Sequence, residues 1–482
     1  MVNFRVIARV FSQVLIFEGL FMLLSAAVSF LYKEPAATPL LFSSIITVIT
    51  GILVFTPLRN EERLSGYKEG YIIITGLWII CSLFGTLPFI LSGSIKNFGN
   101  AFFESISGFT TTGATILTDI ESFPHGVLFW RSMTQWLGGL GFILISLSLI
   151  PVVKSLNVQL TFTDFTGQAT DKINPRVSGS AKRIISIYTI LTMAEAILLI
   201  ISGMPLFDSV CHSLTTMSTG GFSTRDNSIS SFGSPPILII TTVFMLTAGT
   251  NMTLFYHVVK RNYKKTFGNH EFIFYTILCL AFALIVSTTL AFKQDFSAGK
   301  GFLEGTFQTI SIITTTGFYN SDYSQWGSFL IFILFILMFT GGTSGSPSSS
   351  VKIGRILLIA KNVRHEMRRM IHPNASIPVR LDKKAVAESM IHNILIFLIL
   401  YLFLICLSSI VISFMGYDII TAFSTSAAML GNIGPALGAF GPFSNYAAVP
   451  MAGKWFFAFL MLLGRLELLT VLVFFTRGFY RR

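Results

Sequence analysis

Three long runs of this chain contain no Asp, Glu, Lys or Arg: residues 70–95, 323–351 and 389–417. A helix needs about 20 consecutive apolar residues to cross the hydrocarbon core of a bilayer, so each run is long enough to span it. Only 12% of the 482 residues are charged, against roughly 25% in a soluble domain. This composition excludes a soluble multidomain enzyme and a disordered chain, and it predicts an integral membrane protein.

The remaining apolar segments bring the predicted total to about ten membrane-crossing helices. These further spans begin near Val10, Pro39, Gly126, Ile184, Pro236, Phe272 and Trp455.

The basic residues gather in one set of the loops between these spans. The net charge is +12, from 34 Lys and Arg against 22 Asp and Glu. Cytoplasmic loops of membrane proteins are enriched in Lys and Arg, so this set predicts that both termini are cytoplasmic. Binding of nucleic acid is excluded, because the charge comes in loop-sized clusters rather than in a basic domain. The set consists of the N-terminus, residues 59–68, 154–183, 260–265 and 352–384, and the C-terminus.

Four connections on the opposite side share one pattern: a short apolar helix-like segment, a cluster of small residues, and then a glycine. They are residues 102–115, 207–224, 302–320 and 418–436, and their shared glycines are Gly113, Gly220, Gly317 and Gly434. The spacing predicts two leading helices over 1–66, followed by four helix–pore loop–helix repeats. The repeats cover residues 67–154, 155–265, 266–372 (with a broken second helix) and 373–482.

The chemistry of such a repeat follows from the backbone. Non-helical chain within a membrane has to be buried or to line a water-filled cavity. A half-helix that stops inside the membrane leaves carbonyl groups free, and four of them around an axis can replace the water around an alkali cation. Glycine suits this place because it allows left-handed backbone and has no side chain to block the axis. Small-residue clusters are also common where membrane helices pack, but four in equivalent places favour an ion filter.

Besides the four glycines, the predicted filter contains their small or polar neighbours. These are Thr111, Thr112, Ser218, Thr219, Thr315, Thr316, Asn432 and Ile433.

Six short motifs carry a resemblance to a known family: FTTTGAT (109–115), STGGFST (218–224), TTTGF (314–318), GNIGPALG (431–438), IHPNASIPVRL (371–381) and GRLELLTVLVFF (464–475). The chain resembles the Trk/Ktr/HKT superfamily of potassium transporters, and within it the TrkH/TrkG group of bacterial membrane subunits. The resemblance covers essentially the whole chain. It implies an all-α integral membrane protein with two leading helices and four helix–pore loop–helix repeats in pseudo-fourfold arrangement, with K⁺ at the filter residues named above.

The resemblance also implies a function and partners. Similar proteins conduct K⁺ inward across the bacterial inner membrane, form homodimers and sit on a cytosolic ring of regulatory subunits that bind a nucleotide (ATP/ADP or NAD). No cofactor is expected in this chain itself, and membrane lipid is its other expected partner. The chain departs from the family at Gly431–Asn432, where relatives more often have two asparagines, and at 340–350, where relatives have more glycine.

Residues 340–350 (TGGTSGSPSSS) cannot form a continuous helix, because glycine and proline interrupt them. They lie between an apolar run and a basic stretch, on the cytoplasmic half of a span. They form either a buried kink beneath the filter or, as the resemblance implies, an intramembrane gate that moves to open the pore. The predicted gating residues of this loop are Gly341, Gly342, Gly345 and Pro347.

Arg465 lies within the last predicted span, where a charged side chain is costly enough to suggest a function. In similar proteins this arginine points into the pore below the filter and acts as an electrostatic barrier. The alternative is a structural ion pair with Glu18, Glu195 or Glu467. Glu467 is the least suited of the three, because two residues along a helix is not the same face.

The leading prediction is a K⁺ uptake subunit gated by a cytosolic partner. The alternative is a Na⁺-permeable or cation-coupled symporter (K⁺/H⁺ or K⁺/Na⁺), because a one-glycine filter provides few carbonyl layers. An intramembrane enzyme is excluded, because the acidic residues at membrane depth are isolated from one another. The basic stretch 352–384 is predicted to dock the regulatory ring, and its alternative role is to anchor the chain on anionic lipid.

Overall fold

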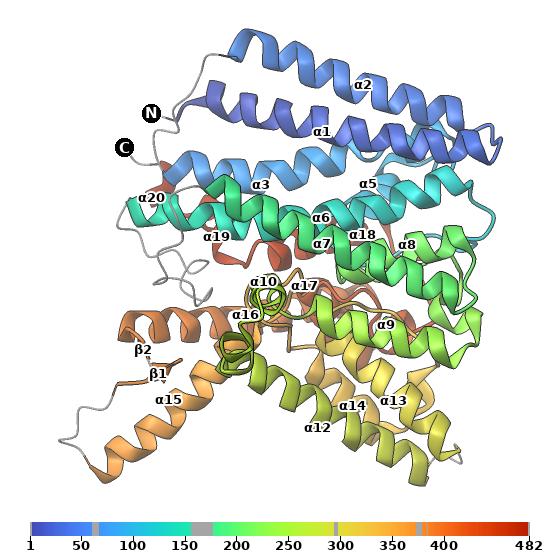
Figure 1. The fold of residues 1–482 in the computed structure, drawn as a ribbon. Helices are drawn as coiled ribbons and strands as arrows, with labels where there is room; N and C mark the ends of the chain where they lie inside the picture. The colour runs from blue at the N-terminus through green and yellow to red at the C-terminus, as the bar shows by residue number, and fades with distance from the viewer. Residues whose placement is uncertain are drawn as a thin grey trace.

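The computed structural model of the chain describes residues 2–59, 67–155, 177–293, 297–372, 378–382 and 384–480. Within these ranges the regular structure is helical except for an antiparallel hairpin of β1 (Arg380–Leu381) and β2 (Lys384–Ala385). Figure 1 shows both termini, the hairpin and α15 (Ile353–Ile371) at one end of the molecule. Parts of three predicted cytoplasmic segments (60–66, 156–176 and 373–377, the last within the motif at 371–381), Lys383 and the terminal residues 481–482 lie outside the described residues.

Two leading helices pack closely against each other at small residues. They are α1 (Phe4–Leu31) and α2 (Ala37–Phe55), the latter continued by η1 (Thr56–Leu58). The hydroxyl of Ser44 on α2 donates to the carbonyl oxygen of Gly19 on α1 at 2.7 Å. A Cβ atom at Gly19 would lie 2.6 Å from the side chain of Val48, so this approach needs glycine.

Each of the four predicted repeats contains a long first helix, a short pore helix and a second helix that returns across the bundle. In the first repeat these are α3 (Tyr67–Phe84) with α4 (Leu87–Leu91), the pore helix α5 (Phe98–Phe109), and α6 (His125–Ser155). In the second they are α7 (Val177–Ile201), the pore helix α8 (Leu206–Met217), η2 (Ser228–Phe232), α9 (Pro235–Ala248), α10 (Met252–Val259) and α11 (Tyr263–Phe267).

The third repeat consists of α12 (His270–Lys293), the pore helix α13 (Ala298–Ile313), η3 (Tyr323–Gln325), α14 (Ser328–Leu337) and α15. The fourth consists of α16 (Glu388–Phe414), the pore helix α17 (Ile419–Gly431), η4 (Gly438–Phe440), α18 (Met451–Arg465), α19 (Leu469–Leu472), η5 (Val473–Phe475) and α20 (Arg477–Tyr480). The predicted fold class, an all-α membrane protein with four helix–pore loop–helix repeats, is confirmed.

The second helices are more broken than the sequence predicted. Among the described residues, six helices are long and apolar enough to cross a membrane, and two bent pairs bring the number to eight. The chain turns by 100° between α9 and α10 and by 111° between α18 and α19, where continuous spans were expected. Glu467 and Leu468 have positive φ at the second break, and Asn251 caps α10 after the first. The break at 340–350 was predicted, and α14 before it has only 10 residues.

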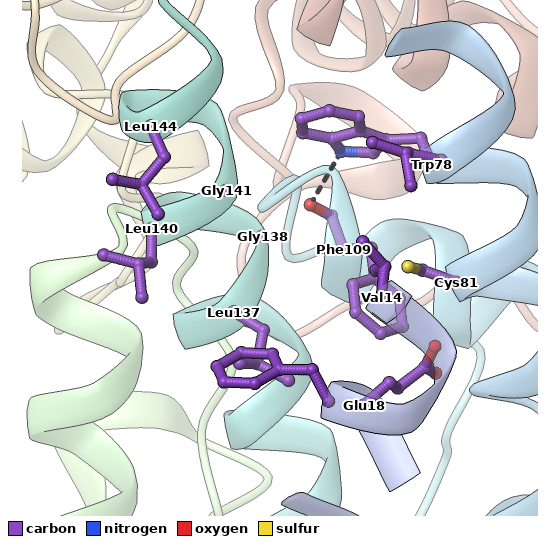
Figure 2. Close-up of a pocket in the computed structure, with 12 residues that line it drawn as sticks. Val14, Glu18, Trp78, Cys81, Phe109, Leu137, Gly138, Leu140, Gly141 and Leu144 are labelled. Atoms are coloured by element: carbon purple, nitrogen blue, oxygen red, sulfur yellow. Dashed lines mark hydrogen bonds between the residues drawn. The ribbon is translucent and has the colours of Figure 1, made fainter. Parts of the chain in front are cut away.

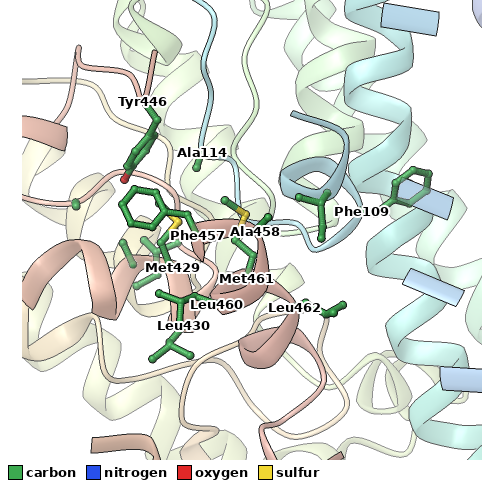
Figure 3. Close-up of a cluster of buried hydrophobic side chains, with 14 of the residues drawn as sticks. Phe109, Ala114, Met429, Leu430, Tyr446, Phe457, Ala458, Leu460, Met461 and Leu462 are labelled. Atoms are coloured by element: carbon green, nitrogen blue, oxygen red, sulfur yellow. The ribbon is translucent and has the colours of Figure 1, made fainter. Parts of the chain in front are cut away.

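The pore helices form the centre of the core. α5, α8, α13 and α17 are buried over most of their length although they carry many Ser and Thr side chains. Figure 3 shows α17 and α18 packed through Met429, Phe457 and Met461, next to Phe109 and Ala114 of the first repeat. All three of the α17 and α18 side chains are fully buried, so the first and fourth repeats share one apolar core.

Candidate functional site

The four pore helices end in the same backbone conformation. The first residue after the turn is left-handed in each case, with φ of 54° at Thr111, 53° at Thr219, 56° at Thr315 and 51° at Asn432. Two residues later a glycine with positive φ follows, and these glycines are Gly113, Gly221, Gly317 and Gly434. The residue between them donates its N–H back to the pore helix at 2.9 Å in all four repeats. The four loops are therefore repeats of one local structure.

This register corrects one predicted match between the loops. Gly220 was expected to be the equivalent of Gly113, but the equivalent residue is Gly221, which has φ of 76°. Gly220 instead takes the place of Thr112, Thr316 and Ile433, and its N–H donates to the carbonyl oxygen of Thr215. Two adjacent glycines satisfy the motif spacing equally well, so the end of the pore helix was needed to choose between them.

The same glycines bring the four loops together into a closed ring. A Cβ atom added to Gly113 would lie under 3.0 Å from the carbonyl oxygen of Gly220, in the next loop. Each of the other glycines meets a carbonyl oxygen of its neighbour in the same way, and real Cβ atoms essentially never show so close a contact. The pairs are Gly221 with Thr316, Gly317 with Ile433, and Gly434 with Thr112. The fourth loop thus returns to the first, and the predicted filter residues lie around one axis.

A hollow lies above this ring and is lined by all four glycines. Tyrosine side chains brace its wall, because the hydroxyl of Tyr446 donates to the carbonyl oxygen of Gly434 at 2.8 Å and that of Tyr323 to Ala436 at 3.0 Å. The amide of Gln135 on α6 donates to the carbonyl oxygen of Gly220 at 2.6 Å. Such an arrangement offers backbone oxygens at fixed positions to a dehydrated cation.

A buried ion pair that the sequence did not predict joins the first two loops. The Nε of Arg131 donates to the carboxylate of Glu104 at 2.6 Å, and both side chains are almost completely buried. Glu104 also accepts from Thr115 and from the backbone N–H of Ile116, while Arg131 donates to the carbonyl oxygen of Ser223. Removing one partner would leave a buried, unpaired charge, so the pair stabilises the loops only as a unit.

A second, more exposed ion pair lies at the rim. Arg225 donates to Asp208 at 2.8 Å and to Glu121 at 3.1 Å. The hydrogen bond to Asp208 raises the pKa of the Arg225 guanidinium above its usual value. The side chain of Arg225 is about one-third exposed, so solvent screens these pairs and they contribute little to stability.

The predicted gate loop, residues 340–350, lies against the filter. The backbone N–H of Ser349 donates to the hydroxyl of Thr315, the left-handed residue of the third pore loop, at 3.0 Å. The loop is closed on itself, since the N–H of Gly342 donates to the hydroxyl of Ser348 at 2.8 Å. A Cβ at Gly342 would overlap the backbone of Gly249, and Gly345 has φ of 81°, so both glycines are needed for this conformation.

Arg465 contacts this loop directly. Its Nη1 donates to the carbonyl oxygen of Pro347 at 2.6 Å and to the hydroxyl of Ser349 at 3.1 Å. Its Nη2 donates to the carbonyl oxygen of Gly138 on α6 at 3.1 Å, and its guanidinium lies 4.3 Å from the centre of the Phe142 ring. The structure thus brings Arg465 together with the predicted gating residues beneath the filter.

The alternative role of Arg465, a structural ion pair, has no support in the described part of the chain. The carboxylate of Glu467 pairs with Arg355 instead. The carboxylates of Glu18 and Glu195 are buried, and the hydrogen bonds of Arg465 among the described residues go to Pro347, Ser349 and Gly138 rather than to either of them.

Glu18 lines an apolar pocket between α1, α3, α5 and α6 (Figure 2). In the same pocket the indole N–H of Trp78 donates to the carbonyl oxygen of Phe109 at 3.1 Å, which holds the end of the first pore helix. Gly138 also lines it, and a Cβ there would overlap that carbonyl group. A Cβ atom at Gly464, just before Arg465, would likewise overlap the carbonyl oxygen of Leu430 at the end of the fourth pore helix. Both second helices therefore pack on a pore helix through glycine.

Comparison with known proteins gives one consistent result. A family model described as "Cation transport protein", TrkH, matches residues 40–479. The Trk system potassium uptake protein TrkH of Halomonas elongata is 35% identical over 485 residues, which cover all of both chains. The protein of the same name from Escherichia coli K12 is 34% identical and covers 99% of this chain and 100% of its own. The crystal structure of the potassium transporter TrkH from Vibrio parahaemolyticus superposes with a TM-score of 0.91 at 30% identity, over 99% of this chain and 100% of the other.

Proposed function

Because the chain belongs to the TrkH family of cation transport proteins, we propose that it takes up K⁺ across the bacterial inner membrane through the ring of four pore loops. It is a membrane transport protein and not an enzyme. The observation that carries the proposal is the closed ring of glycine–carbonyl approaches at Gly113, Gly221, Gly317 and Gly434. The four loops contact one another through backbone atoms, so that carbonyl oxygens rather than side chains are available to replace the water around an ion.

Flux in proteoliposomes tests this function. The purified chain, reconstituted with its regulatory subunit, should pass K⁺ and Rb⁺ much faster than Na⁺ and Li⁺. Comparable Na⁺ flux would favour the Na⁺-permeable alternative. K⁺ movement against its own gradient, driven by an imposed H⁺ or Na⁺ gradient, would favour a coupled symporter over channel-like conduction. Absence of K⁺ flux under all of these conditions would overturn the proposal.

We further propose that both termini and α15 face the cytoplasm, where a ring of nucleotide-binding subunits controls the gate. Two observations support this proposal: the basic helix α15 and the hairpin lie at the end of the molecule that holds the termini, and α15 follows the gate loop directly. A movement of α15 would therefore act on the loop through continuous chain. Homodimerisation and nucleotide binding (ATP/ADP or NAD) by the partner are proposed on the resemblance to the Trk superfamily.

Charge reversal on α15 should weaken binding of the regulatory subunit. Arg368 and Arg369 lie exposed in the last turn of α15, which suits them to contact a partner. We expect Arg368→Glu/Arg369→Glu to reduce co-purification of the subunit markedly, and Lys264→Glu/Lys265→Glu, an exposed basic pair on α11, to leave it near wild type. If the first variant keeps the complex at moderate salt, these arginines serve instead to anchor the chain on anionic lipid.

A further inference from the structure

We infer that the gate loop contains a second cation site, formed by the carbonyl oxygens of Ser346 and Ser348 and the hydroxyl of Ser348, which the ammonium group of Lys352 occupies in this structure. The site lies below the filter, and its proposed ligand when Lys352 leaves is the transported K⁺. The identity of that ion rests on the proposed function.

The environment of Lys352 is that of a cation bound by backbone oxygens. Its side chain is buried, with 5% exposed. The ammonium donates to the carbonyl oxygen of Ser346 at 3.2 Å, to that of Ser348, and to the hydroxyl of Ser348 at 3.5 Å. No ion pair among the described residues includes Lys352. Its ammonium is therefore in direct contact with neutral oxygen atoms, the ligands that also replace water around an alkali cation in a filter. The carboxylates of Glu467 and Glu271 add electrostatic stabilisation without a direct ion pair.

The site lies next to the predicted filter and to Arg465. Ser349, which follows one of the oxygen ligands, donates to the hydroxyl of Thr315 in the third pore loop. Arg465 donates to the carbonyl oxygen of Pro347, which lies between the two carbonyl groups that Lys352 contacts. The two side-chain cations therefore bind three consecutive carbonyl groups of the loop. Both cations also lie over the ring of Phe142, Lys352 at 5.3 Å and Arg465 at 4.3 Å from its centre. The side chains of Lys352 and Arg465 thus bind the oxygen atoms that an ion leaving the filter would meet next.

Lys352 is also placed to respond to α15. It is the residue immediately before that helix, so a displacement of α15 moves the ammonium relative to the loop. The carboxylate of Glu271 on α12 holds the segment on both sides of Lys352, because it accepts from the N–H of Ser344 at 2.6 Å and from the N–H of Gly354 at 3.0 Å. While these contacts hold, a bound ammonium on the same chain competes with K⁺ for the oxygen ligands.

Substitution of Lys352 in the full-length protein tests the inference. Lys352→Met removes the charge, Lys352→Gln removes it but keeps an N–H donor for the loop, and Lys352→Arg keeps the charge. Lys361→Met, nine residues on in α15 with a half-buried side chain that donates to the carbonyl oxygen of Arg380, is the matched control. Without the regulatory subunit, we expect both neutral variants to raise basal K⁺ flux at least about tenfold, since a like charge is removed from the pathway. Lys352→Arg keeps a positive charge at the site and should raise flux less than either neutral variant. Lys361→Met should stay near wild type.

A direct measurement of ion binding separates this inference from the proposed function. Crystals of Lys352→Gln soaked in Tl⁺, which replaces K⁺, should show an anomalous peak between the carbonyl oxygens of Ser346 and Ser348, and wild-type crystals should not. No peak at this place, or unchanged flux in both neutral variants beside a K⁺-conducting wild type, would overturn the inference. A wild type that conducts no K⁺ even with its regulatory subunit would instead overturn the proposed function, while the Tl⁺ peak would still report the site.

Discussion

Replacing Gly317 with alanine is expected to lower K⁺ flux at least about tenfold and to reduce discrimination against Na⁺. Two costs add at this position. An alanine with φ near 80° loses about 1 kcal/mol or more in the left-handed region. Its Cβ would also overlap the carbonyl oxygen of Ile433, so one of the two loops has to move. Because the ring closes through all four loops, the displacement changes the oxygen positions for every ion that passes. Flux of K⁺, Rb⁺, Na⁺ and Li⁺ in proteoliposomes measures both effects.

The second repeat gives this experiment its internal control. Gly221→Ala should behave like Gly317→Ala, because it has the same φ and overlaps the carbonyl oxygen of Thr316. Gly220→Ala should have a smaller effect, because its φ is ordinary and the nearest atoms to its new Cβ belong to the side chain of Gln135 rather than to the backbone of another loop. It should still lower flux somewhat, because Gln135 hydrogen-bonds the second pore loop. Equal elution profiles and thermal stability would show that the variants fold. Unchanged cation ranking in the alanine variants of all four ring glycines would remove the filter assignment.

Replacing Arg465 with alanine is expected to raise K⁺ flux in the absence of the regulatory subunit. At an effective dielectric of about 20, two like charges about 4 Å apart repel by roughly 4 kcal/mol, so one buried arginine can limit occupancy strongly. The substitution also removes the hydrogen bonds that tie Pro347 and Ser349 of the gate loop to α18. Arg465→Lys should give an intermediate flux, because it keeps the charge and loses the two-pronged contact. Arg477→Ala, on the exposed α20, should leave the flux at the wild-type level.

Combining Arg465→Ala with a shortened 340–350 loop tests whether the two form one gate. Each change alone should raise basal flux, and the double variant should gain less in free energy than the sum, because both remove the same contact. The thermal stability of each sample has to be measured beside its flux. A variant that loses stability while its flux stays low would assign Arg465 a structural role in packing α18 against α6.

The sequence was sufficient for the fold class and for the position of the four pore loops. Uncharged runs such as 389–417 predict spans because lipid offers no hydrogen bonds to an open backbone, so these segments have to be helical. The recurrence of a glycine after a short apolar helix predicts four pore loops, and three of the predicted glycines (Gly113, Gly317 and Gly434) have the left-handed φ that the turn requires. These properties are local, because each depends on residues within one segment.

The choice between Gly220 and Gly221, the breaks after α9 and α18, and the partners of the buried charges were decided only in three dimensions. Glu104 pairs with Arg131, Lys352 binds loop oxygens, and Arg465 reaches Pro347 across 118 positions of the chain. A buried charge takes whichever partner the packing brings within a few ångströms, and its own neighbours in sequence do not specify that partner. The sequence by itself therefore determined which segments enter the membrane and where the four pore helices end. The tertiary structure decided which pore-helix ends contact one another, because closure of the ring depends on contacts between segments that lie far apart in the chain.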